Sequence, residues 1–307
     1  MTVRWVAIAS GQGGQRPEHA QRAAASALGD AWRRAVGGAV GGEEGAEMES
    51  IHAIAANRVA QPTIAAWQLD AWSSLATRLP PPVLVAGYSV GEVAACAIAG
   101  AFAPADAIAL AAERARLMDD AAPYPGALAA ILGLQERDVV SLCEGRDAAI
   151  AIRNGPRHFI VGGRREDVER IVADALAAGA ARAHALAVST PAHTPWLAAA
   201  VPRFAQCLAR TSPAPLRIPM ISAIDAARIA TPGDVVCALS RQIATRLDWA
   251  ACMDAIGEMQ PDAVLELGPC NALARMFAEA VPGVPVRAIE DFRNPAAAAA
   301  WVRAQSR

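Results

Sequence analysis

Short apolar runs alternate along this chain with longer stretches whose apolar residues recur at helical spacing. The segments 3–9 and 83–86 are compact apolar runs followed by glycine, a pattern that predicts buried strands. Each run leads through a glycine-containing turn into a stretch of helical periodicity, 17–36 after the first and 92–99 after the second. Strand, turn and helix in repeated order predict an α/β fold built on a parallel sheet.

The middle of the chain shows a different order of elements. Six segments there predict strand, helix, strand, strand, helix and strand in turn: 127–132, 136–143, 148–153, 159–161, 165–178 and 183–188. This β-α-β-β-α-β order is the ferredoxin-like arrangement. We therefore expect a small ferredoxin-like subdomain at 125–190, inserted into a large α/β domain formed by 1–124 and 191–307. Beyond the insert, helices are predicted at 195–210 and 232–246.

Composition limits the classes of protein to which the chain can belong. Of its 307 residues 54% are apolar and 19% are charged, which supplies a large core and argues against disorder. The formal net charge of −2 gives no sign of the basic surface typical of nucleic-acid binding. No apolar run is long enough to cross a bilayer, and the N-terminal segment lacks the features of a signal peptide. We therefore expect a cytoplasmic monomer without membrane contact.

The six cysteines are scattered, without a CxxC pair or a metal-type spacing to histidine. They are predicted to be small buried apolar residues, since disulfides are rare in the cytoplasm. The sequence therefore predicts no metal site.

Gly87-Tyr88-Ser89-Val90-Gly91 matches the pattern G-x-S-x-G between a predicted strand and a predicted helix. A serine on such a sharp turn presents its hydroxyl above the sheet, and the glycines let the backbones cross closely. The N–H of Val90 would point from the start of the helix toward an oxyanion. The motif predicts a nucleophilic Ser89 in a large domain that is α/β-hydrolase-like.

A serine nucleophile needs a base, because its hydroxyl is otherwise a weak nucleophile. The chain contains five histidines: His19, His52, His158, His184 and His193. His193 lies in a loop between Pro191 and Pro195, where a side chain can be held rigidly over a cleft. A lone histidine is more often structural than catalytic, so the residues alone leave the identity of the base open.

Several separate stretches resemble one family, the malonyl-CoA:acyl-carrier-protein transacylases and the related acyltransferase domains of fatty-acid and polyketide synthases. They are Gly11-Gln12-Gly13-Gly14-Gln15, Gly87-Tyr88-Ser89-Val90-Gly91-Glu92, Glu113-Arg114, Arg116-Leu117-Met118, Asn154-Gly155-Pro156, Ala192-His193 and Glu266-Leu267-Gly268-Pro269. They follow the family's order along almost the whole chain. The resemblance implies malonyl transfer from malonyl-CoA to the phosphopantetheine thiol of an acyl-carrier protein, with the coenzyme A thioester as substrate and no resident cofactor.

The resemblance also implies a role for each matching residue. Ser89 is acylated, and His193 takes its proton and later activates the carrier-protein thiol. The backbone N–H groups of Gln12 and Val90 bind the oxyanion. The family orients its histidine with a main-chain carbonyl or a polar group just before an aromatic residue that opens a helix, and Asp248 occupies that position here. A helix N-cap is the competing interpretation of Asp248.

Arg114 is the residue that the resemblance assigns to the substrate carboxylate. Its guanidinium offers a planar, bidentate partner for the free end of a malonyl group. Arg116 competes with it by proximity, and an arginine on this helix would serve equally in a surface ion pair. Tyr88, Ala192 and Asn154 are expected to line the substrate site. Tyr88 stands where the family usually has histidine, and Ala192 where malonyl-specific relatives often have a larger or polar residue, so a substituted malonyl group would find room.

Three alternatives remain open. The chain also resembles the malonyl-transfer subunit of malonate decarboxylase, and a trans-acting polyketide acyltransferase is equally compatible. A serine hydrolase or thioesterase of the α/β-hydrolase class shares the elbow but carries its histidine late, whereas no histidine follows His193. A non-catalytic binding module would not need Ser89, His193 and Arg114 together. For docking of an acidic carrier protein, the candidates are four arginines of the small subdomain: Arg153, Arg157, Arg164 and Arg165.

Overall fold

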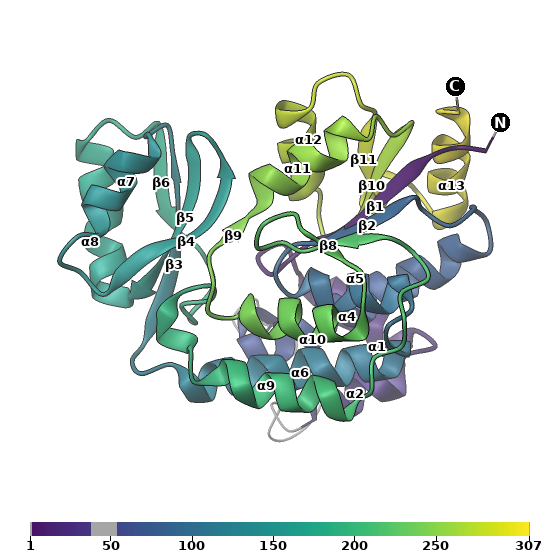
Figure 1. Cartoon of the computed structure of the whole chain (residues 1–307), viewed down its shortest axis with the longest axis horizontal. Coiled ribbons are helices and arrows are strands. Elements are labelled where there is room, and N and C mark those ends of the chain that lie inside the picture. Colours follow the sequence, from purple (N-terminus) through teal and green to yellow (C-terminus); the bar gives the residue numbers. More distant parts are fainter. Residues whose placement is uncertain (1, 38–53, 307) are drawn as a thin grey trace.

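The computed structural model describes residues 2–37 and 54–306, whose strands form two separate sheets (Figure 1). The larger sheet has six strands in the order β11-β10-β1-β2-β7-β8, with parallel pairing except between β7 and β8. Its strands are β1 (Trp5–Ala9), β2 (Leu84–Gly87), β7 (Met220–Ile221), β8 (Arg228–Ile229), β10 (Ala263–Leu267) and β11 (Val286–Ala288). The predicted α/β class with a parallel central sheet is confirmed.

The three central strands of this sheet are buried along their whole length. A parallel sheet is covered on both faces, which explains why these strands read as continuous apolar runs. Ala9 at the end of β1 pairs with both Gly87 of β2 and Leu267 of β10. The carboxyl ends of the three strands therefore lie side by side, and the loops that follow them meet at one edge of the sheet.

Helices pack on both faces of the large sheet, with α5 and α10 on one side and α11 and α12 on the other (Figure 1). The helices of this domain are α1 (Pro17–Ala25), α2 (Gly29–Val36), α4 (Asn57–Ala76), α5 (Gly91–Ala99), α6 (Pro104–Ala121), α9 (Ala200–Arg210), α10 (Pro232–Arg241), α11 (Trp249–Glu258), α12 (Ala272–Ala280) and α13 (Pro295–Ala304).

The single helix predicted at 17–36 is two helices, α1 and α2. The hydroxyl of Ser26 donates to the Ala23 carbonyl at 2.8 Å and accepts from the Leu28 N–H at 3.1 Å. These local bonds offer the backbone an alternative to the helical ladder, so α1 ends at this serine. The helix predicted at 232–246 is also shorter, and α10 ends at Arg241.

The smaller sheet has the strand order β6-β3-β5-β4-β9. Its elements are β3 (Gly126–Leu132), α7 (Glu136–Cys143), β4 (Ala148–Gly155), β5 (His158–Arg164), α8 (Arg165–Ala177), β6 (Arg182–Ala185) and β9 (Leu247–Asp248). The first six follow the predicted β-α-β-β-α-β order and pair as a ferredoxin-like sheet. The two-residue strand β9 joins from the large domain and was not predicted, and the boundaries at 125 and 190 stay a prediction.

The two faces of the small sheet belong to different cores. Val139 of α7 and Val168 of α8 pack with Phe159 of β5 in a cluster of their own. Leu128 and Ile160 point the other way and join the core of the large domain. The small sheet therefore closes over the large domain with an apolar face.

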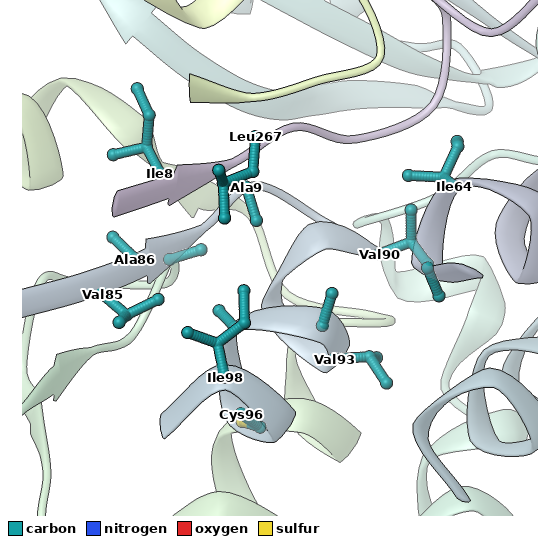
Figure 2. Close-up of a cluster of buried hydrophobic side chains, with 14 of the residues drawn as sticks. Ile8, Ala9, Ile64, Val85, Ala86, Val90, Val93, Cys96, Ile98 and Leu267 are labelled. Carbon is teal, nitrogen blue, oxygen red and sulfur yellow. The ribbon is translucent and has the colours of Figure 1, made fainter. Parts of the chain in front are cut away.

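Apolar side chains also fix the turn between β2 and α5. Figure 2 shows Ile8 and Ala86 of the sheet in the same buried cluster as Val90 and Val93, which lie at the start of α5. All four are buried completely or almost completely. Because protein cores are close-packed, this cluster holds the first turn of α5 against the sheet and so determines where Ser89 sits.

Candidate active site

Ser89 lies on a strained turn directly after β2. Its φ is 56°, a left-handed conformation that a residue other than glycine adopts at a cost. A side chain at Gly91 would collide with the Ala9 carbonyl oxygen, and one at Gly87 with the backbone nitrogen of Glu92. The two glycines of the motif are therefore required by close backbone crossings at the elbow.

The hydroxyl of Ser89 and the imidazole of His193 are in hydrogen-bond contact. The distance from Ser89 Oγ to His193 Nε2 is 2.7 Å, and His193 Nδ1 lies 2.5 Å from the main-chain carbonyl of Gln242. A carbonyl only accepts, so Nδ1 carries the proton and Nε2 is free to accept the serine proton. The structure thus brings the predicted nucleophile to the histidine that the resemblance selected.

The backbone around His193 is held as tightly as its ring. Its φ is 62°, and its N–H donates to the Ile243 carbonyl at 2.8 Å. Gln242 and Ile243 follow directly after α10, and both of their carbonyls accept from His193. The early end of α10 therefore has a physical reason: these two carbonyls bind His193.

Burial keeps the imidazole of His193 neutral. Its side chain is 1% exposed. Burial, reinforced by the positive charge of Arg114, lowers the pKa of His193 to about 3, against the opposing hydrogen bond to Gln242. At neutral pH the residue is consequently an unprotonated base.

Arg114 points from α6 at the serine and forms no ion pair with an acidic side chain of residues 2–37 and 54–306. Nη2 lies 3.5 Å from Ser89 Oγ and donates to Gln242 Oε1 at 2.8 Å, while Nη1 donates to Gln61 Oε1 at 2.7 Å. The guanidinium is fully buried, and its Nε has no hydrogen-bond partner in the part of the chain that the structure describes. Burial lowers the pKa of Arg114 to about 10, which leaves it charged at neutral pH.

Arg116 proves to be a surface residue with partners of its own. It pairs with Glu113 at 2.6 Å and with Asp120 at 2.7 Å. A buried charge that has only neutral partners is costly, whereas an exposed ion pair is ordinary. Of the two arginines, Arg114 is therefore the better candidate for binding a substrate carboxylate, and this role stays a prediction.

Gln242 connects these groups and was missed by the sequence analysis. Its carbonyl holds His193, its Oε1 accepts from Arg114, and its Nε2 donates to the Ser89 carbonyl at 2.9 Å. The same Nε2 donates to Glu92 Oε2 at 2.9 Å. No motif in the sequence marks a glutamine after a helix, so only the fold reveals this role.

A cavity of about 50 Å³ opens beside the serine. Three of the residues predicted for the site line it together with Ser89 and His193: Gln12, Tyr88 and Ala192. Gln61, which accepts a hydrogen bond from Arg114, lines it as well and was not predicted. Its other polar lining residues are Asn57 and Thr190, and its apolar wall consists of Met118, Leu128, Ile152, Ile160, Leu186 and Val188. The cavity thus lies between the large domain and the apolar face of the small sheet.

The two predicted oxyanion donors, Val90 and Gln12, lie at the start of α5 and on the cavity wall. Val90 is the N-cap residue of α5, where backbone N–H groups are not used by the helix. Gln12 lines the cavity, and its side chain donates to the Ala55 carbonyl at 2.9 Å, which anchors the loop after β1. Oxyanion binding by these two N–H groups stays a prediction.

Tyr88 and Asn154 meet at the edge of the site. Burial raises the pKa of Tyr88 well above its ordinary value, and the neighbouring Asn154 side chain opposes the rise. The Tyr88 ring also packs edge-on against Trp249, with 5.4 Å between the ring centroids. Asn154 is buried on β4, so this contact joins the elbow to the small sheet.

The structure favours the helix N-cap interpretation of Asp248 over the orienting role. Asp248 Oδ1 accepts from the Ala251 N–H at 3.0 Å, as a helix N-cap does. Its carboxylate also pairs with Arg153 at 3.0 Å. The group in contact with His193 Nδ1 is instead the main-chain carbonyl of Gln242.

The remaining histidines lie elsewhere or have structural partners. His19 is buried, and its Nε2 lies 2.5 Å from Glu290 Oε1. His158 and His184 belong to β5 and β6 of the small sheet. His52 lies outside the described residues. Within residues 2–37 and 54–306, no group of His, Cys, Asp or Glu side chains could hold a metal ion, and no helix is both long and apolar enough to cross a membrane.

A serine and a neutral histidine in hydrogen-bond contact at a strand-to-helix elbow, next to a buried guanidinium, form a site of the kind found in α/β acyltransferases. The chain belongs to the acyl transferase domain family, whose model matches residues 44–289.

Known members of this family resemble the chain over most of its length. The malonyl CoA-acyl carrier protein transacylase of Mycobacterium tuberculosis is 35% identical over 236 residues, 76% of this chain and 78% of that protein. The protein of the same name from Escherichia coli K12 is 31% identical over 71% of this chain and 72% of its own length. The crystal structure of MCAT from Mycobacterium tuberculosis superposes with a TM-score of 0.85 at 30% identity and covers 98% of this chain and 99% of that one.

Proposed function

We propose that this chain transfers a malonyl group from malonyl-CoA to the phosphopantetheine thiol of an acyl-carrier protein. One observation carries the proposal: the hydroxyl of Ser89 lies between the base Nε2 of His193 and the unpaired guanidinium of Arg114. A malonyl group has a thioester at one end and a carboxylate at the other. The site offers a nucleophile for the first and a permanent charge for the second. The relatives named above support the same substrate.

In the first half-reaction Ser89 attacks the thioester carbonyl while His193 accepts its proton. The developing oxyanion is bound by the N–H groups of Gln12 and Val90, and the proton leaves with the thiol of coenzyme A. Arg114 meanwhile holds the carboxylate and so fixes the reacting carbonyl over the serine. Every group in this scheme belongs to the chain, so the proposal includes no resident cofactor, and coenzyme A enters only as the thioester.

In the second half-reaction the carrier-protein thiol attacks the malonyl ester of Ser89. His193 now removes the thiol proton and returns it to the serine. The four arginines suggested for docking do not form one patch. Arg153 and Arg164 are engaged with Asp248 and Asp147, and Arg157 and Arg165 lie at opposite ends of β5. The position of the carrier protein is therefore not defined by these arginines.

Intact-mass analysis after exposure to a panel of acyl-CoA thioesters tests this proposal. We expect a malonyl adduct at Ser89 that is discharged by a carrier protein, and little adduct from acetyl-CoA or longer simple acyl-CoA thioesters. Rapid release of free malonate without a carrier protein would instead identify a thioesterase. Absence of any adduct would favour a non-catalytic binding module.

The same panel should contain methylmalonyl-CoA, because one observation favours a substituted malonyl group as a second candidate. Ala192 and the apolar side chains of the small sheet line the cavity, and none of them has a polar group to satisfy. An adduct of methylmalonate as strong as that of malonate would establish the broader specificity. The panel does not identify the carrier protein, so a malonate decarboxylase subunit or a trans-acting polyketide enzyme would be recognised by testing candidate carrier proteins as acceptors.

A further inference from the structure

A buried carboxyl group lies directly behind the reacting residues. Glu92 follows Ser89 by three residues at the start of α5, and its side chain has no exposed surface. The Ala223 N–H donates to its Oε1 at 3.0 Å, and Gln242 Nε2 donates to its Oε2 at 2.9 Å. Both carboxyl oxygens therefore accept hydrogen bonds. This arrangement fits a carboxylate, whereas a protonated acid would set its O–H against one of the two donors.

The side-chain amide of Gln242 links the ionisation state of Glu92 to the reacting residues through hydrogen bonds. With Nε2 directed at Glu92 and at the Ser89 carbonyl, Oε1 is left facing the guanidinium of Arg114. The reversed amide would set an N–H against that guanidinium, and Arg114 would lose a partner. The main-chain carbonyl of the same residue holds His193, so a shift of Gln242 would also disturb the base.

We infer that ionised Glu92 is a positioning residue for acyl transfer: it fixes Gln242, and through it Arg114 and His193, and its protonation releases them. The inference rests on the proposed function, since it concerns the same site. Glu92 has no place in the bond-making steps, in which the thioester C–S bond breaks, an ester C–O bond forms at Ser89, and the serine proton passes through His193 to coenzyme A. These steps neither take up nor release a proton overall.

The charges around Glu92 place its ionisation in the neutral range. Burial raises the pKa of Glu92 to about 7, although the Ala223 N–H and Arg114 of α6 oppose the rise, and Asp225 adds to it from the loop after β7. The two thiols that face it, Cys96 on α5 and Cys252 on α11, have pKa values that burial raises, so they remain neutral.

Glu92 and His193 therefore ionise in different pH ranges. The pKa of His193 is lowered to about 3, so its imidazole is already neutral well below the range in which Glu92 loses its proton. A rate that rises with pH near 7 would report Glu92 and not the catalytic base.

The test is the pH dependence of the burst of coenzyme A released from malonyl-CoA, measured for wild type and for Glu92→Gln between about pH 5.5 and pH 8.5. For wild type we expect the second-order rate constant of acylation to rise with pH, with a midpoint near 7. Glu92→Gln keeps the size of the side chain but has no charge to lose. We expect its rate constant to be flat over this range and about 30-fold below the wild-type value at the alkaline end.

Glu266→Gln is the matched control. Glu266 is also fully buried, and burial raises its pKa to about 8, but its Oε2 accepts from the Ala274 N–H at 2.7 Å, outside the cavity. The same substitution there should leave the acylation profile unchanged. Glu92→Asp, which restores a carboxylate, should recover a rate that depends on pH.

The inference is overturned if Glu92→Gln forms acyl-enzyme with the wild-type midpoint, or if the wild-type rate is flat near pH 7. If Glu92→Gln does not fold, infrared difference spectra of the Glu266→Gln protein, which still contains Glu92, provide the test. The band of a buried carboxylic acid must disappear with rising pH at the midpoint of the rate. The lack of such a band refutes the inference. Absence of a malonyl adduct in wild type at every pH would instead refute the proposed function itself.

Discussion

The two walls of the active-site cavity are built in different ways. On the side of the large domain, Ser89, Arg114 and His193 are tied to one another or to Gln242 by hydrogen bonds of 2.5–3.5 Å. On the side of the small sheet, the lining side chains of β3, β4 and β5 are apolar and belong to the core of the large domain: Leu128, Ile152 and Ile160.

We infer from this difference that one wall determines the rate of acyl transfer and the other determines which acyl group is accepted. In the polar network each group depends on the position of the next, so removal of one member leaves a buried charge or donor without a partner. The apolar wall only limits the space for the acyl group and keeps out water. Apolar side chains of this kind can be exchanged for others of similar volume at a moderate cost in folding stability. Substitutions in the network should therefore change the rate, whereas substitutions in the wall should change which acyl group is accepted.

The most severe test of the network is Ser89→Ala. We expect loss of the malonyl adduct and a fall in transfer activity of about 10⁴-fold or more, because no other residue can form the ester. Alanine meets the same left-handed backbone as serine at this position, where φ is 56°, so the thermal unfolding midpoint should change little. A malonyl adduct that persists in Ser89→Ala would show that another residue carries the acyl group.

Arg114→Ala should have the next largest effect. Without the guanidinium nothing in the cavity holds the substrate carboxylate, and we expect kcat/KM for malonyl-CoA to fall about 10³-fold, as when one partner of a buried charge pair is removed. Activity with acetyl-CoA should rise relative to that with malonyl-CoA.

Arg116→Ala is the control for this prediction. It lies on the same helix, but its guanidinium forms exposed ion pairs with Glu113 and Asp120. Exposed pairs contribute little, so this variant should keep the kinetics of the wild type. A preserved malonyl preference in Arg114→Ala would show that another group binds the carboxylate.

Much of this site follows from local sequence. The elbow has to be glycine-rich because two backbone crossings leave no room for a side chain, and a strand before it and a helix after it are visible as patterns. The ferredoxin-like order of the small subdomain is also local, because each of its strands and helices has its own periodicity. His193 and Arg114 were assigned by the resemblance and not by spacing.

The parts that could not be predicted depend on contacts between distant segments. Gln242 lies 153 residues after Ser89, and its role arises only because α10 ends where its carbonyl can meet His193. Asp248 was chosen for its position before an aromatic residue, but the fold gives that carboxylate to a helix start and to Arg153. The two- and three-residue strands β8, β9 and β11 are too short to leave a pattern.

On the apolar wall, Ile160→Ala should change selection more than rate. The side chain is 5% exposed on β5 and lines the cavity, so its loss enlarges the space beside the serine. We expect kcat/KM for methylmalonyl-CoA relative to malonyl-CoA to increase about 10-fold, the range for one or two methyl groups in an apolar pocket. Thermal unfolding should show a loss of about 2–4 kcal/mol from the cavity. A loss of malonyl transfer as large as that expected for Arg114→Ala would contradict the proposed division of roles between the two walls.

The smallest effect is predicted for Asp248→Asn. If the carboxylate oriented His193, its neutralisation would disturb the base, and kcat would fall by orders of magnitude. In the structure the main-chain carbonyl of Gln242 does this work, and a carbonyl cannot be removed by a side-chain substitution. Asparagine still caps a helix, so only the partly buried pair with Arg153 weakens, and kcat/KM should stay within about 3-fold of wild type. Asp248→Ala should cost about 1 kcal/mol of stability through the lost cap, again with little change in kcat. A fall of about 100-fold in the asparagine variant, at unchanged stability, would return the orienting role to Asp248.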